Sequence, residues 1–237
     1  MIVHFIENIG AKVLNVTLAF LSVITFSLLS FLNILAPNNY TFKIKKKLTL
    51  QLYRTSLYSL SPFSLLAFLL GFIVVGVFII IAAEYNFHLQ IGTLIVNFIV
   101  NVFAPVFTAF YILNKSKILS KNEDFENTLI PYALSSVIST FSLSVLFATI
   151  ILTSSYIPIF FFMHMDLHTY KQLVITSIEV QDIITLSIKS ILYGFIIVII
   201  PVYGRLHSST TLHILRKIIF SVFFIELISL VIKSSLS

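Results

Sequence analysis

The chain of 237 residues contains no cysteine, and only 10% of its residues are charged. Without cysteine it has no disulfide, no thiolate nucleophile and no cysteine-ligated zinc or iron–sulfur cluster. A soluble domain carries about 25% charged residues, so the polar surface here is too small to cover a water-facing globule. Apolar residues make up 58% of the sequence and the mean hydropathy is +1.05, which also excludes a disordered chain. A multi-span membrane protein remains.

Glycine is scarce as well: the chain has six and shows no phosphate-binding glycine pattern. We therefore expect that it is not an enzyme and binds no cofactor, and that any ATP and Mg²⁺ chemistry belongs to a partner chain. The net charge of +6 is typical of cytoplasmic loops in a membrane protein, so we expect no nucleic-acid partner.

A helix needs about 20 mostly apolar residues to cross a membrane. Five stretches meet this requirement: Pro62–Ala83, Gly92–Leu113, Pro131–Tyr156, Ile183–Tyr203 and His213–Ile232. A sixth, Val13–Ala36, is uncharged but rich in Asn, Ser and Thr, and either spans or lies at the interface. We predict an all-α polytopic protein with five transmembrane helices preceded by an N-terminal interfacial or amphipathic helix.

Basic residues gather in alternate gaps between these stretches. The basic gaps hold Lys43, Lys45, Lys46, Lys47 and Arg54, then Lys115, Lys117 and Lys121, then Arg205, Arg216 and Lys217. The other gaps hold Glu84 and His88, or Asp166, Lys171, Glu179 and Asp182. The positive-inside rule puts the basic gaps in the cytoplasm, which leaves the C-terminus outside.

Two ionisable residues fall inside the predicted spans. Lys189 and Glu226 lie in antiparallel stretches, at depths of roughly 10 to 14 Å from the outer surface at 1.5 Å per residue. They can therefore pair, either as part of a proton or ion relay or as an ion pair that fixes helix register. The sequence offers only two such groups, which favours the register pair.

His164 and His168 have the i,i+4 spacing of a metal site on a helix face, but only Asp166 lies near as a third ligand. We expect ordinary loop histidines there and no metal site.

Two cytoplasmic segments have alternative interpretations. Thr41–Leu60 is either a basic amphipathic helix on the inner leaflet, turning into the span at Pro62, or a plain linker. Asn114–Thr128 is either a docking helix for a cytoplasmic partner or a solvated loop, and its charged residues are Lys115, Lys117, Lys121, Glu123, Asp124 and Glu126.

Three blocks of sequence resemble the MlaE/YrbE-type permease, the membrane subunit of Mce-associated ABC phospholipid transporters. They are Gln51-Leu52-Tyr53 with Ser59-Leu60 and the glycine-bearing span that follows, Phe103-Ala104-Pro105-Val106, and the run from Tyr170 through Asp182, Lys189-Ser190 and Tyr193-Gly194 to Glu226. The resemblance covers roughly residues 45–235. It divides the chain into N-terminal interfacial and elbow helices, 1–60, and a permease transmembrane domain, 61–237.

The chain also departs from that family. Only 25 residues separate Pro105 from Pro131, fewer than the family has. Lys115 and Glu123 stand where its coupling Arg and a later Glu occur, and Asn101 and Val102 replace an Arg-Glu pair. These departures suit a divergent member or one half of a heterodimer.

The resemblance implies a function and partners. A second permease copy, identical or not, forms the core in the inner (cytoplasmic) membrane, with ABC ATPase subunits beneath and an Mce-domain protein outside. Phospholipid moves between the inner membrane and an outer carrier or the outer membrane, which maintains lipid asymmetry. The residues implied along the lipid path are Val74, Ile81, Tyr85, Asn101 and Pro105.

The alternative function is a proton- or ion-conducting or structural subunit of a respiratory or rotary complex, built on Lys189 and Glu226. A rotary stator needs an arginine deep in a span. The three arginines of this chain, Arg54, Arg205 and Arg216, fall at span ends or in loops, which counts against this alternative.

Overall fold

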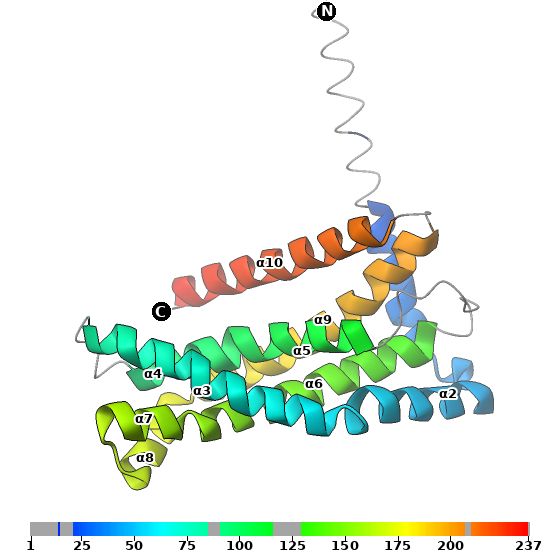
Figure 1. The fold of residues 1–237 in the computed structure, drawn as a ribbon. Helices are drawn as coiled ribbons and strands as arrows, with labels where there is room; N and C mark the ends of the chain where they lie inside the picture. Colours follow the sequence, from blue (N-terminus) through cyan, green and yellow to red (C-terminus); the bar gives the residue numbers. More distant parts are fainter. Residues whose placement is uncertain (1–13, 15–20, 85–90, 116–128, 207–209, 237) are drawn as a thin grey trace, which may run out of the picture.

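In the computed structural model, long helices run side by side along one common direction (Figure 1). The structure describes residues 14, 21–84, 91–115, 129–206 and 210–236, and these contain helices and no strands. The first half contains the helix Leu21–Leu35, the 3₁₀ turn η1 (Pro37–Asn39), α2 (Phe42–Leu52), the π-helical turn η2 (Tyr53–Leu57), α3 (Leu60–Glu84), α4 (Ile91–Phe98), the π-helical turn η4 (Ile99–Phe103) and α5 (Ala104–Lys115). The second half contains α6 (Leu129–Ser154), α7 (Tyr156–Met163), α8 (Leu167–Ser177), α9 (Val180–Leu206) and α10 (Thr211–Leu236).

Four helical segments of the described chain are long and apolar enough to cross a membrane: Phe42–Ile81, Gly92–Lys115, Leu129–Met163 and Val180–Arg205. They contain four of the five predicted spans, so the chain is a multi-pass membrane protein. The fifth, His213–Ile232, is helical within α10. It is not among these four, and it contains the charged residues Arg216, Lys217 and Glu226.

The turn predicted at Pro62 is replaced by a continuous helical segment. The predicted amphipathic helix of Thr41–Leu60 is helical from Phe42, and α2, η2 and α3 follow one another without a corner (Figure 1). Pro62 lies in the first turn of α3, where its missing amide hydrogen costs little. The backbone adjusts just upstream, where the amide of Tyr58 donates to the carbonyl of Tyr53. The hydroxyls of Thr55 and Ser56 each bond to Ser139 of α6, which holds this segment on the bundle.

The helices α6 and α9 pack closely because small residues line their contact. Six hydroxyl side chains of α6 are buried, Ser135, Ser136, Ser139, Thr140, Ser144 and Ser154, and of these residues Ser136 and Thr140 lie beside Gly194 of α9. A Cβ added at Gly194 of α9 would lie 2.7 Å from the Cα of Val137 and 3.1 Å from the carbonyl oxygen of Ser136. Close backbone approach over small residues is the usual way that helices associate in membranes, where apolar burial gives no advantage over lipid.

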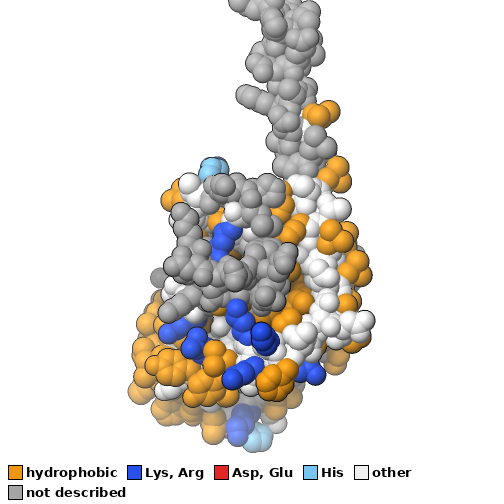
Figure 2. Space-filling model, turned by 90° about the vertical axis from the view of Figure 1, so that its right-hand side faces the viewer, with side chains coloured by type: hydrophobic (Ala, Val, Ile, Leu, Met, Phe, Trp, Pro, Cys, Tyr) orange, Lys and Arg blue, Asp and Glu red, His pale blue; other side chains and the backbone are white. Residues whose placement is uncertain are grey.

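Lysine and arginine side chains gather at one end of the molecule, which we call the basic end. Figure 2 looks onto it and shows several Lys and Arg side chains and, among the described side chains, no Asp or Glu. The starts of α2, α6 and α10 and the ends of α5 and α9 lie at this end (Figure 1). It is the end that the positive-inside rule assigns to the cytoplasm.

The close approach of α6 and α9 makes a testable prediction. We expect Gly194→Ala to lower stability by about 1–3 kcal/mol, because the new methyl group meets backbone that must move. Thermal unfolding in detergent measures the change. Gly76→Ala is the control, since its Cβ would meet only Pro158 Cβ at an ordinary 3.7 Å. Equal unfolding temperatures for the two variants would contradict this packing.

Candidate functional site

A buried ion pair joins α10 to α9. The Nζ of Lys189 lies 2.6 Å from Oε2 of Glu226, and the Lys189 side chain is 6% exposed. The hydroxyl of Tyr193, one turn further along α9, donates to Oε1 of the same carboxylate over 2.5 Å. Both oxygens of Glu226 are therefore hydrogen-bonded to α9. The structure thus brings together the two charged residues that the sequence placed at equal depth.

Lys189 has a second partner in the backbone of η4. Its Nζ donates to the carbonyl oxygen of Asn101 over 2.6 Å. In an α-helix this carbonyl would accept from the amide four residues later, but that residue is Pro105, which has no amide hydrogen. The π-helical turn accommodates the proline, and the amide of Ala104 donates to the carbonyl of Ile99. Lys189 therefore donates to the carbonyl of Asn101 in place of the amide that Pro105 lacks.

A second polar cluster lies next to the ion pair, toward the end of the molecule opposite the basic end. Asn101 Nδ2 donates to Oδ1 of the buried Asp182 over 2.6 Å. The backbone amide of Glu179 donates to the other oxygen of Asp182 over 3.0 Å. Lys233 of α10 donates to Oδ1 of Asn97 over 2.6 Å and lies 3.4 Å from Asp182. Polar residues of η4 and of α4, α9 and α10 thus meet here.

Asn101 is the link between the two clusters, because its side-chain amide contacts Asp182 and its backbone carbonyl contacts Lys189. Its Oδ1 atom is buried and has no hydrogen-bond partner among the described residues. An amide does not exchange its proton as an acid or a base near neutral pH. The network therefore contains many polar groups but is interrupted for proton transfer at Asn101.

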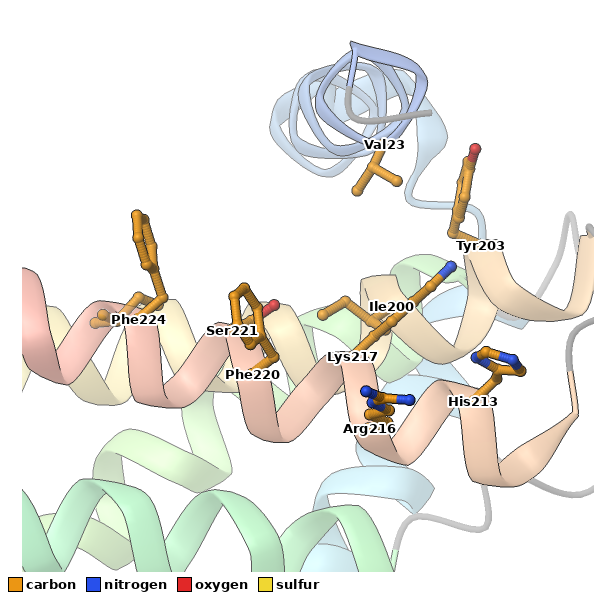
Figure 3. Close-up of a pocket in the computed structure, with 10 residues that line it drawn as sticks. Val23, Ile200, Tyr203, His213, Arg216, Lys217, Phe220, Ser221 and Phe224 are labelled. Carbon is orange, nitrogen blue, oxygen red and sulfur yellow. The ribbon is translucent and has the colours of Figure 1, made fainter. Parts of the chain in front are cut away.

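Two cavities that are lined by described residues border α10. The first, of about 440 Å³, is lined by the polar residues Asn97, Asn101, Lys189, Glu226 and Lys233 and by apolar residues that include Val102, Phe223 and Leu230. The second, of about 670 Å³, lies between the helix Leu21–Leu35, the end of α9 and the start of α10 (Figure 3). Its walls are mostly apolar and aromatic, with His213, Arg216 and Lys217 on the side of α10.

The five residues implied along a lipid path do not share one surface in this chain. Asn101 and Pro105 are buried in η4 and α5, and Asn101 lines the smaller cavity. Val74 is half-buried in α3, and Ile81 of the same helix is 46% exposed. Tyr85 lies outside the described residues. In the predicted coupling segment, Lys115 is exposed at the end of α5, and Lys117, Lys121, Glu123, Asp124 and Glu126 lie outside the described residues.

The residues around His164 and His168 have a structural role. Asp166 caps the N-terminus of α8 by accepting hydrogen bonds from the backbone amides of His168 and Thr169. The hydrogen bond from the Thr169 hydroxyl lowers the pKa of the Asp166 carboxyl. Within the described residues, no group of three His, Asp or Glu side chains lies close enough to hold a metal ion.

The sequence analysis did not predict the roles of Tyr193, which binds Glu226, or of Asn97, Asp182 and Lys233 in the neighbouring polar cluster. The spacing of these residues along the sequence could have indicated that they share helix faces. Asn97 and Asn101 are four residues apart, and so are Lys189 and Tyr193, while Asp182 precedes Lys189 by seven residues and Lys233 follows Glu226 by seven. Residues four and seven apart lie on one face of a helix.

A multi-pass helical protein with a buried polar contact and cavities between helices is typical of membrane transport proteins. The family model described as "Permease MlaE" matches residues 122–231, which contain α6 to α9 and most of α10. The match supports an MlaE/YrbE-type permease over these residues, in agreement with the third block of the resemblance, and it suggests a transport subunit rather than an enzyme. No curated protein matches the chain.

The ion pair between α9 and α10 makes a second testable prediction. We expect Glu226→Met to lower stability by about 3 kcal/mol or more, because the Lys189 ammonium loses its carboxylate in a buried site. The double variant Lys189→Met/Glu226→Met should recover most of the loss, since no unpaired charge remains. Denaturant unfolding in detergent measures both changes.

Lys233→Met is the control, because this lysine is half-exposed and such a pair contributes about 0–1 kcal/mol. A double variant no more stable than Glu226→Met alone would contradict the interpretation as a pair that fixes α10 on α9.

Proposed function

We propose that the chain is the permease subunit of an ABC-type transporter that moves phospholipid between the inner membrane and an outer carrier, and so contributes to lipid asymmetry. The observation that carries the proposal is the family match over residues 122–231, which contain Lys189, Tyr193 and Glu226 of the contact between α9 and α10. The mostly apolar cavities beside α10 support it, since acyl chains need such walls.

The proposal includes α10 as a fifth transmembrane helix and an N-terminal helix at the interface. Lys189 and Tyr193 bind Glu226, and α10 runs from the basic end to the opposite end (Figure 1). In this arrangement the charged side chain of Glu226 faces a partner rather than lipid, which removes most of the cost of crossing the membrane. The C-terminus would then lie outside the inner membrane.

The partners in the proposal follow from the two ends of the bundle. ABC ATPase subunits, which supply ATP and Mg²⁺, would dock at the basic end beside Lys115 and the segment 116–128. An Mce-domain protein would sit at the opposite end, near α8. A second permease copy would cover apolar side chains that are exposed on α3 and α10, among them Leu65, Phe72, Phe223 and Leu230. Along the lipid path, Val74, Ile81 and Tyr85 would border the space that the two copies enclose, Asn101 would be reached through the smaller cavity, and the buried Pro105 would act through the shape of η4.

The alternative, a proton- or ion-conducting subunit, would use the same buried residues. The number of polar groups around Lys189 and Glu226 is greater than the sequence suggested and favours this alternative. The interruption at Asn101 argues against it, because a relay needs a titratable group or water at each step. Phospholipid transport therefore remains the function that we propose.

Affinity purification of the chain from mild detergent, with mass spectrometry of proteins and lipids, tests the proposal. We expect an ABC ATPase, an Mce-domain protein and phospholipid to be recovered with it. Reversal of the loop charges, Lys115→Glu/Lys117→Glu/Lys121→Glu, should reduce ATPase recovery severalfold, because an interface of opposite charge loses its attraction.

The matched control is Lys171→Glu in α8, a charge reversal at the opposite end of the molecule, which should leave ATPase recovery unchanged. Recovery of respiratory or rotary-motor subunits, without an ABC ATPase, would refute the proposal in favour of the alternative.

A further inference from the structure

In the larger cavity, the charged side chains and the apolar side chains lie at different positions along the axis of α10. Arg216, Lys217 and His213 lie in the first two turns of α10, at the basic end (Figure 3). Phe220 and Phe224 follow one and two turns further into the molecule, and Val23 points into the same space from the N-terminal helix. From His213 to Phe224 the helix rises by about 16 Å. A polar head and an apolar tail would therefore meet different walls.

The charged wall is cationic, and no carboxylate of the described residues neutralises it. Among the described residues that line the cavity none is acidic. Arg216 and Lys217 form no ion pair with any carboxylate in the described part of the chain. In Figure 3 the side chain of Lys217 extends from α10 toward Tyr203 of α9, so its ammonium group lies between these two helices. An anionic group would be held there by two permanent positive charges.

The N-terminal helix closes one side of the cavity. The hydroxyl groups of Ser22 and Tyr203 are 2.6 Å apart, and the rings of Phe26 and Tyr203 are in contact with centroids 5.6 Å apart. These contacts fix the helix Leu21–Leu35 against the end of α9, on the opposite side of the space from α10. The cavity is therefore bounded by three helices and has a shape that the fold maintains.

We propose that this cavity binds a phospholipid of the cytoplasmic leaflet with a net negative headgroup. The headgroup phosphate would pair with Arg216 and Lys217, and an acyl chain would pack against Phe220, Phe224 and Val23. A zwitterionic headgroup fits less well, because the described residues that line the cavity include no acidic side chain to bind its ammonium group. A free anion would leave the aromatic walls without a partner. The inference goes beyond the proposed transport function and holds even if the chain moves no lipid.

The absence of tryptophan from the sequence makes a direct test available. Phe220→Trp places a single fluorophore in the cavity and keeps an aromatic side chain at this position. The full chain is reconstituted in phosphatidylcholine vesicles that contain a small fraction of either brominated phosphatidylglycerol or brominated phosphatidylcholine. Bromine on the acyl chains quenches tryptophan at short range, so quenching reports which lipid occupies the site.

We expect brominated phosphatidylglycerol to quench Trp emission at mole fractions about twenty-five-fold lower than brominated phosphatidylcholine, since Arg216 and Lys217 each favour an anionic lipid by about fivefold. Adding Arg216→Ala/Lys217→Ala should remove this preference while quenching by phosphatidylcholine stays the same. Unchanged quenching by phosphatidylcholine also shows that the double variant still inserts and folds.

Leu69→Trp on α3 is the matched control. Leu69 is exposed on α3 and is not among the residues that line the cavity. We expect no preference between the two lipids at Leu69. Equal quenching by both lipids at Phe220, or an equal preference at Leu69, would overturn the proposed site.

Discussion

The carbonyl oxygen of Asn101 is the group on which the arrangement of α9 and α10 depends. Pro105 removes the amide that would bond to it, and Lys189 donates to it instead. A lysine held at this depth needs a carboxylate, and Glu226 of α10 supplies one over 2.6 Å. Tyr193 binds the second oxygen of that carboxylate. One proline in the second span is thereby connected, through three side chains, to the position of the last helix.

The polar contact between α9 and α10 determines where the two cavities beside α10 lie. Because α10 is fixed to α9 by buried side chains, the faces of α10 on either side are free to border open space, and both cavities lie there. The described residues that line the smaller cavity carry charges of both signs, whereas the charged residues that line the larger cavity are all basic. Such walls suit amphiphilic molecules, which agrees with a permease for phospholipid.

Hydropathy and charge predicted much of the fold, because membrane burial demands long apolar helices whatever their packing. The similar depths of Lys189 and Glu226 in antiparallel spans also predicted that their side chains would meet. The turn at Pro62 was wrong, since a proline in the first turn of a helix does not force a corner and contacts with Ser139 hold α2 in line. The roles of Asn101 and Tyr193 depend on which helices adjoin, which a single sequence does not show. Val74, Ile81 and Tyr85 stay predictions, because a lipid path between two copies is not a property of one chain.

The central claim is that α10 crosses the membrane antiparallel to α9, and its most direct test is the sidedness of the C-terminus. Because the chain has no cysteine, single cysteines report position cleanly. In right-side-out inner-membrane vesicles, we expect an impermeant thiol reagent to label Ser235→Cys and the α8 reference Lys171→Cys. The α2 reference Lys46→Cys should react only after permeabilisation. Labelling of Ser235→Cys together with Lys46→Cys, only after permeabilisation, would contradict the account.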